Sequence, residues 1–146
     1  MTWAEVNLLE ALSAYIAMGR VRTTRDVEGF FSALQSAFPF GGNRIAWEEV
    51  PGASIISAPA GLDPSEAFVH FVRNTLAGED IGGELVAIGD NQVNFAILGR
   101  FDDLLEVMPL ITGFPQHTYV FPFPSLDWCA NLTFEDVMCF GRAPAR

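Results

Sequence analysis

The sequence contains no lysine, and the eight basic residues among its 146 are all arginines. They are opposed by 18 acidic residues, which gives a formal net charge of −10 at neutral pH. The imbalance is largest between Ile45 and Cys139, where 14 acids face only Arg73 and Arg100. Nucleic-acid binding requires clusters of lysine and arginine that displace counterions from phosphates. The composition therefore excludes a nucleic-acid partner and favours a basic protein as the partner.

Cysteine is scarce as well, and the two that occur, Cys129 and Cys139, are too few for a disulfide scaffold. Both fall in predicted strands, without a CxxC spacing and without a neighbouring histidine or cysteine pair. This setting does not favour redox chemistry or metal binding. We expect both thiols to be small core residues in a reducing compartment.

Long apolar runs and a targeting segment are also missing. No stretch reaches the roughly 18 uncharged apolar residues that a membrane span needs. The first five residues lack the basic start of a signal peptide, and Glu10 introduces a charge before a long apolar run develops. We therefore expect a cytoplasmic protein that has no membrane partner.

Catalytic motifs are lacking too. The glycines at 82 and 83 precede a predicted strand and do not follow one, and no GK[ST] sequence occurs, so a phosphate-binding loop is excluded. A nucleophile needs a base within reach, and nothing in the sequence near His70 or His117 marks either histidine for that role. His70 falls on the polar side of a predicted helix, where we expect it to be solvated. We predict no catalytic residue and no cofactor, and hence a protein that is not an enzyme.

Two segments near the start have helical spacing. The first begins with the capping box Thr2-x-x-Glu5, ends at Gly19 and carries a broad apolar stripe. The second begins near Thr23 or Thr24 and places apolar residues at spacings of three and four up to residue 38. We expect these two helices, within residues 1–40, to form a helical hairpin packed on a sheet.

Two further helices are predicted later in the chain. One begins at Asp63-Pro64, which supplies an Asx cap and a proline at the first helical position, and ends near residue 78. The other is short and acidic, uses Asp103-x-x-Glu106 as a capping pair and is limited in length by Pro109.

The first predicted hairpin of strands covers residues 44–58. Pro51-Gly52 suits the central positions of a type II turn. With that turn, Trp47 lies opposite Ile56 and one face of the hairpin is apolar.

A second predicted hairpin covers residues 84–98. A turn at Asp90-Asn91 aligns five large apolar side chains on one face, namely Val86, Ile88, Val93, Phe95 and Ile97. Three closing strands follow within residues 116–141, and the last of them, at 137–140, is apolar at every position, which predicts cover on both faces.

The predicted order of elements is ααββαββαβββ. Helices alternate with hairpins and not with single strands, so we expect a mainly antiparallel sheet of about seven strands, about four helices and the α+β class. The length predicts a single domain covering residues 1–146. We expect the tail at 142–146 to be loose.

Acidic residues gather in two segments that we expect at the surface. Glu79 and Asp80 lie in a glycine-rich loop, and Asp102, Asp103 and Glu106 open the fourth helix, where the helix dipole favours them. A metal site built from the last three would need a ligand from elsewhere, so we predict no metal. The five acids either form a solvated surface that keeps an apolar protein in solution or bind a cationic partner. In the second case we predict all five as partner-binding residues.

The closing stretch carries a family resemblance. It contains TYVFP at 118–122, Asp127-Trp128, NLTFE at 131–135 and Phe140-Gly141. This ending, in a short acidic α+β chain, resembles the immunity proteins that bacteria pair with secreted toxins, including those of contact-dependent growth inhibition and other polymorphic toxin systems. The resemblance implies an inhibitor that binds a cognate toxin, of a basic and nuclease type, through an acidic surface. It assigns no binding residues.

Two other functions are compatible with the sequence. A small-molecule-binding or enzymatic α+β domain would have a polar cavity between its sheet and helices. A homodimer would use the broad apolar stripe of the first helix.

Overall fold

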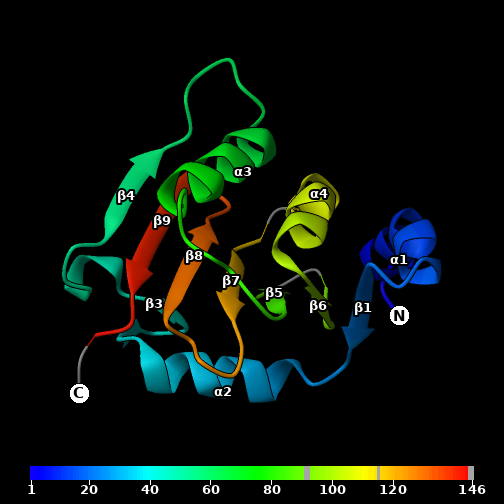
Figure 1. Cartoon of the computed structure of the whole chain (residues 1–146), viewed down its shortest axis with the longest axis horizontal. Helices are drawn as coiled ribbons and strands as arrows, with labels where there is room; N and C mark the ends of the chain where they lie inside the picture. Colours follow the sequence, from blue (N-terminus) through cyan, green and yellow to red (C-terminus); the bar gives the residue numbers. More distant parts are fainter. Residues whose placement is uncertain (91–92, 115, 145–146) are drawn as a thin grey trace.

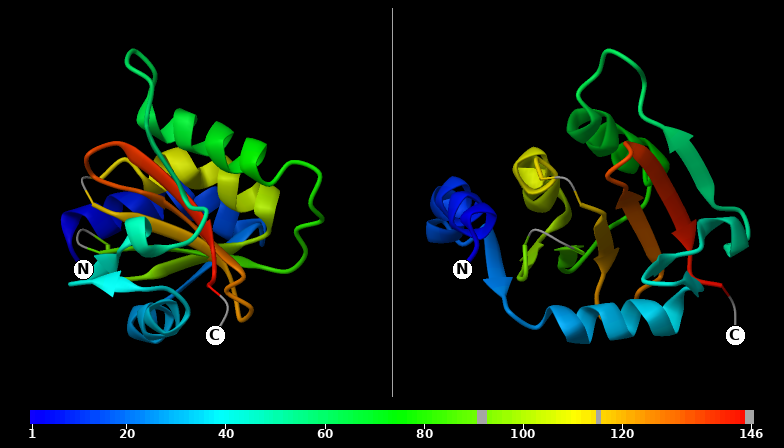
Figure 2. Two further views of the ribbon diagram at one scale, coloured as in Figure 1. Left: turned by 90° about the vertical axis from the view of Figure 1, so that its left-hand side faces the viewer. Right: turned by 180° about the vertical axis from the view of Figure 1, so that it is seen from behind.

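The computed structural model describes residues 1–90, 93–114 and 116–144. A seven-stranded antiparallel sheet lies between three helices on one face and one helix on the other (Figure 1). Figure 2 shows the same three layers from the side and from behind. The α+β class, the four helices and the antiparallel sheet of seven strands are confirmed. The predicted order of elements also matches, except that strand β1 is added between the first two helices.

The elements have the following bounds. The helices are α1 (Trp3–Ala17), α2 (Val27–Ala37), α3 (Pro64–Thr75) and α4 (Phe101–Ile111), with a 3-10 turn η1 (Trp47–Glu49). The strands of the large sheet are β1 (Val21–Thr24), β4 (Ser54–Ser57), β5 (Leu85–Gly89), β6 (Ala96–Gly99), β7 (Thr118–Pro122), β8 (Trp128–Leu132) and β9 (Val137–Arg142). Their spatial order is β1-β6-β5-β7-β8-β9-β4, and β2 (Phe40–Gly41) pairs with β3 (Arg44–Ile45) in a separate ribbon.

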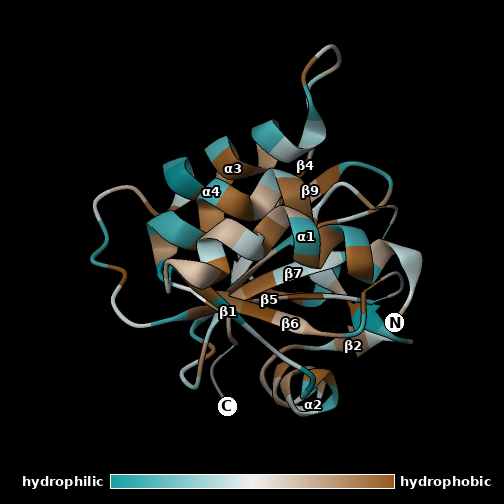
Figure 3. Ribbon diagram, turned by 90° about the vertical axis from the view of Figure 1, so that its right-hand side faces the viewer, coloured by the Kyte–Doolittle hydropathy of each residue, from teal (hydrophilic) through white to brown (hydrophobic). Residues whose placement is uncertain are grey.

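The sheet is buried on both faces because helices cover each side. Along β5, Leu85 and Ala87 join the core beneath α1, α3 and α4, whereas Val86 and Ile88 join the core above α2. Since adjacent residues of a strand point to opposite faces, such a strand is apolar at every position. Figure 3 shows the apolar sides of the helices turned towards the strands.

The predicted helical hairpin of residues 1–40 is wrong. Strand β1 separates the two helices, and α1 and α2 lie on opposite faces of the sheet (Figure 1). The segment from Val21 to Thr24 is rich in β-branched residues and pairs antiparallel with β6. Helix α2 therefore begins later than predicted, with Asp26 as its N-cap. The first helix starts as predicted, with both hydrogen bonds of the capping box between Thr2 and Glu5.

The predicted hairpin at 44–58 is also wrong, although its turn is present. The Ala53 amide donates to the Val50 carbonyl across Pro51-Gly52, and the strand that follows, β4, pairs with β9 and not with the segment before the turn. Trp47 lies in η1, so it does not face Ile56. Its indole Nε1 instead donates to Asn131 Oδ1 at 3.0 Å, in the core above α2.

The hairpin of β5 and β6 is confirmed, but its predicted register is wrong. A two-residue turn at Asp90-Asn91 would place Val86 opposite Phe95, whereas the structure places Val86 opposite Leu98. Asn91 itself lies outside the described residues. The three-residue shift is odd, so it turns Val86 to the face opposite the one occupied by Phe95.

Helix α4 differs from its prediction at both ends. Arg100 occupies the N-cap position without a side-chain hydrogen bond, so Asp103 and Glu106 are not a capping pair. Pro109 lies inside the helix, which continues to Ile111. A proline removes one main-chain donor, and here packing of the buried residues around it outweighs that loss.

The three closing strands are confirmed. The last strand is longer than predicted, since β9 includes Arg142 and the Ala143 amide donates to the Asp127 carbonyl at 3.0 Å. Part of the predicted loose tail is therefore ordered, and residues 145–146 lie outside the described part of the chain. Phe140 packs beneath the helices and Cys139 on the α2 side, as expected for a strand covered on both faces.

Candidate functional site

Helices α3 and α4 pack antiparallel to each other on the face of the sheet that α1 also covers. The hydroxyls of Ser65, at the start of α3, and Thr112, after α4, are 2.6 Å apart. At the other end, Arg73 in the last turn of α3 donates to Asp102 in the first turn of α4 at 3.0 Å. Between the helices lies a groove of about 530 Å³, which we call the α3–α4 groove. It is lined by Arg20, Glu66, Val69, His70, Arg73, Asp102, Leu105, Glu106 and Pro109.

Three of the predicted partner-binding acids meet at this groove. Asp103 and Glu106 share the guanidinium of Arg20, at 2.8 and 2.7 Å respectively. The hydrogen bond to Asp103 raises the pKa of Arg20. The Asp102 side chain remains 85% exposed despite its contact with Arg73. Asp102 and Asp103 lie in the first turn of α4, where the dipole of the helix favours negative charge, and Glu106 follows in the next turn.

The charge of this region is negative even after its ion pairs are counted. Four carboxylates, those of Glu66, Asp102, Asp103 and Glu106, lie at or beside the α3–α4 groove with two guanidinium groups. Each of the two arginines is already within an ion pair. The groove therefore presents excess carboxylate to any partner.

The structure places the other two predicted acids elsewhere. Glu79 pairs with Arg142 at the end of β9, whereas Arg20 precedes β1. These strand ends lie on the same end of the sheet but five strand positions apart, or about 24 Å at 4.8 Å per strand. Asp80 is exposed beside Glu79. The five predicted residues thus form two separate groups and not one patch.

Most carboxylates of the described residues are not paired with an arginine. All 18 carboxylates are described, and seven of them have an arginine within 4.0 Å. Six of the seven arginines in this part of the chain are used in these pairs. Eleven carboxylates are left without such a partner among the described residues, so the surface is strongly acidic.

The two histidines occupy different environments. His70 is exposed and lines the α3–α4 groove, which confirms its predicted solvation. His117 is buried, and its Nε2 is 3.5 Å from Arg44 Nη1. Burial lowers the pKa of His117, while Asp90 opposes this effect. The contact with Arg44 was not predictable from the local sequence, because Arg44 reaches His117 from the β2–β3 ribbon, 73 residues away.

Tyr119 carries a buried hydroxyl that makes no well-formed hydrogen bond within the described residues. Burial raises the pKa of Tyr119, whereas a weak contact with the main chain of Ile45 opposes this effect. Replacing Tyr119 by phenylalanine removes a polar atom that is desolvated without a bond in return, so we expect the free energy of unfolding to rise by about 1 kcal/mol. Urea denaturation measures the change, with the half-buried Tyr15→Phe as control. A fall in stability would show that the hydroxyl is satisfied in solution.

Both cysteines lie in the core of the protein. Cys129 and Cys139 are free and buried, as expected for small core residues. Burial raises the pKa of Cys139 to about 12, which keeps it protonated and unreactive near neutral pH.

Among the described residues, no helix has the length and apolarity needed to cross a membrane.

Helix α1 exposes several large apolar side chains. Trp3, Val6, Ile16 and Met18 lie at its surface, while Leu8 is buried. A homodimer through this helix stays a prediction.

Comparison with models of known protein families and with curated proteins finds no match to this chain.

Proposed function

We propose that the protein is an immunity protein, which binds a cognate toxin domain of basic, nuclease type and neutralises it. The observation that carries the proposal is the α3–α4 groove, at or beside which four carboxylates outnumber two arginines that are already paired. The resemblance of the closing strands to toxin-immunity proteins supports the same function. In this proposal the protein acts in the cytoplasm as a stoichiometric inhibitor.

The mechanism follows from charge complementarity. A toxin that cleaves nucleic acid must bind phosphates with basic side chains. The exposed carboxylate of Asp102 and its neighbours offer those side chains an alternative partner. Opposite potentials speed the encounter of the two proteins. A bound inhibitor then excludes the nucleic acid both by its charge and by its volume.

The decisive experiment is co-purification with the product of the neighbouring reading frame. A toxin module encoded there should form a one-to-one complex and lose its activity on binding. If the neighbour is metabolic, or if it forms no complex, the immunity proposal is wrong. A small-molecule-binding or enzymatic domain would then be the function to test, by screening for ligands that raise the melting temperature.

The contribution of α4 can be measured in that complex. Replacing Asp102, Asp103 and Glu106 together by alanine removes three negative charges from the α3–α4 groove. Exposed charge pairs contribute about 0.2–1 kcal/mol each, so we expect binding to weaken about tenfold. The salt dependence of the dissociation constant should become flatter, because fewer charges are screened.

A matched variant separates local docking from total charge. Glu10, Glu28 and Glu49 are exposed acids on other elements, and none has an arginine within 4.0 Å among the described residues. Their triple alanine variant changes the net charge by the same amount. We expect it to slow association slightly and to keep most of the affinity. Equal losses in both variants would contradict docking at α4.

A further inference from the structure

A second cavity, of about 430 Å³, lies at the other end of α4. Three segments form it, namely the start of α3, residues 109–114 at the end of α4, and the turn between β8 and β9. We call it the end cleft. Pro109 lines both the end cleft and the α3–α4 groove, so the two hollows adjoin at this residue.

Part of the end-cleft lining is apolar, with an exposed aromatic residue at its rim. Pro64, Phe114 and Leu132 contribute to the lining. Phe134 also lines it, and this residue is 57% exposed at the tip of the β8–β9 turn. Its ring contacts His117 edge-on, with the ring centroids 5.2 Å apart, so the aromatic ring is held in place. An exposed aromatic residue beside a cleft is typical of the residues that dominate binding energy.

Carboxylates lie beside these apolar residues. Asp63 and Asp136 line the end cleft, and Glu135 follows Phe134 in the same turn. Of these three acids, Glu135 has an arginine at 4.0 Å, Arg44, and the other two have none within that distance in the described part of the chain. Asp63 uses its Oδ1 to accept from the Ser65 amide at the start of α3. The end cleft therefore combines an aromatic face with carboxylates that arginine does not neutralise.

We propose that the end cleft receives an arginine-bearing segment of the toxin, an inference that rests on the proposed function. A guanidinium group is planar, stacks on aromatic rings and donates in pairs to carboxylates, whereas an ammonium group does so less well. Phe134 supplies the ring, and Asp136 and Asp63 supply the acceptors. Helix α4 has 11 residues and spans about 16 Å. One partner can therefore cover both the α3–α4 groove and the end cleft within an interface of ordinary size.

The end cleft can be tested without the toxin. The probe is the peptide acetyl-Phe-Arg-amide, added to the ¹⁵N-labelled protein while amide chemical shifts are followed by NMR. We expect saturable shifts in the amides of residues 63–65, 110–114 and 132–136. The same peptide with citrulline in place of arginine is neutral and nearly the same in shape, so it should bind more weakly. Equal binding of the two peptides, or shifts centred elsewhere, would overturn the assignment.

Variants test the named residues in the same titration. We expect Phe134→Ala and Asp136→Asn each to weaken binding of the arginine peptide about two- to fivefold, by loss of stacking and of one charge pair. Asparagine suits position 136, where φ is +63°, so the turn is kept. The matched controls, Trp3→Ala on α1 and Asp127→Asn before β8, remove an exposed aromatic residue and an exposed acid away from the end cleft. The controls should leave binding unchanged.

The toxin complex separates this inference from the proposed function. If the complex forms and neither Phe134→Ala nor Asp136→Asn weakens it, the end cleft is not the docking site although the immunity function holds. If no toxin binds but the arginine peptide occupies the end cleft, the immunity function is wrong and the arginine site stands on its own.

Discussion

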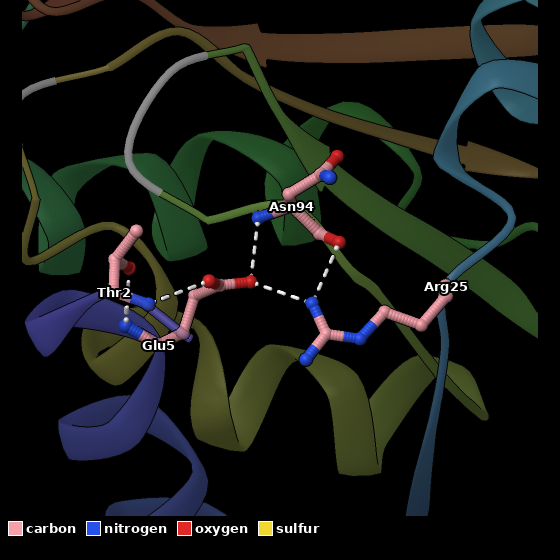
Figure 4. A network of polar contacts seen from close by, with 4 residues as sticks. All are labelled: Thr2, Glu5, Arg25 and Asn94. Carbon is pink, nitrogen blue, oxygen red and sulfur yellow. Dashed lines mark hydrogen bonds and ion pairs between the residues drawn. The ribbon is translucent and has the colours of Figure 1, made fainter.

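Replacing Glu5 by alanine is expected to lower the free energy of unfolding by about 2–3 kcal/mol. The Glu5 carboxylate is only 3% exposed and accepts hydrogen bonds from three sources. Oε1 accepts from the Thr2 amide at 3.0 Å, and Oε2 accepts from Arg25 Nη1 at 2.8 Å and from the Asn94 amide at 3.1 Å (Figure 4). Hydrogen bonds to charged groups contribute about 1.5–3 kcal/mol, and their loss also leaves partly buried donors unsatisfied. Urea denaturation of both proteins measures the difference.

The pH dependence of stability provides a second measurement at the same residue. The bond from the Thr2 amide, followed by those from Asn94 and Arg25, lowers the pKa of Glu5 against the effect of burial. A carboxyl whose pKa is lower in the folded state stabilises the fold above its unfolded pKa, and this stability is lost as the pH falls through the folded pKa. Glu5→Gln keeps the shape of the side chain without the charge. Its stability should fall less than that of the original protein as the pH is lowered below about 4.5. Identical slopes for the two proteins would contradict this role for Glu5.

The Glu5 network also shows which contacts a sequence can predict. The bonds between Thr2 and Glu5 form within four residues, and their spacing is sufficient to predict them. Arg25 and Asn94 join Glu5 from 20 and 89 residues away. Those bonds exist because β1 follows α1 and pairs with β6. A strand of four residues between two helical patterns gave too weak a local signal to predict that path.

The predicted register between β5 and β6 was wrong for a related reason. A strand that is buried on one face alternates between apolar and polar residues, and the alternation fixes its register. Strand β5, LVAIG, is buried at all five positions and has no such alternation. The hairpin with β6 was predictable from composition and from the turn residues, but the register depends on helices that cover both faces of the sheet.

Only part of the candidate site was predictable from the sequence. The acids at the start of α4 were identified because helix starts favour negative charge. Arg20, which pairs with Asp103 and Glu106, is 83 residues away from Asp103 in the chain. The end cleft was not predicted, because it combines segments from α3, α4 and the β8–β9 turn that meet only in the folded protein.

Replacing Gly141 by alanine is expected to lower the free energy of unfolding by about 2 kcal/mol, the second largest effect. Gly141 lies in β9, where η1 and the following turn cross the sheet. An added Cβ would lie 2.8 Å from Val50 Cγ1, 2.9 Å from Trp47 Cζ3 and 3.4 Å from Ala53 Cβ. Adding one methyl group to a packed core usually costs about 1–3 kcal/mol, because rigid side chains must move. Trp47 cannot move freely, since its indole donates to Asn131.

The control for this substitution is Gly82→Ala. An added Cβ at Gly82 meets no heavy atom within 4 Å, and its φ is not in the left-handed region. We expect this variant to be neutral or slightly more stable, since alanine restricts the unfolded chain. Val50→Ala should restore part of the stability in the Gly141→Ala background, because it removes the nearest contact. The two substitutions would then show a favourable coupling energy in a double-mutant cycle. Without that coupling, contact between β9 and the turn at Val50 would not be the source of the loss.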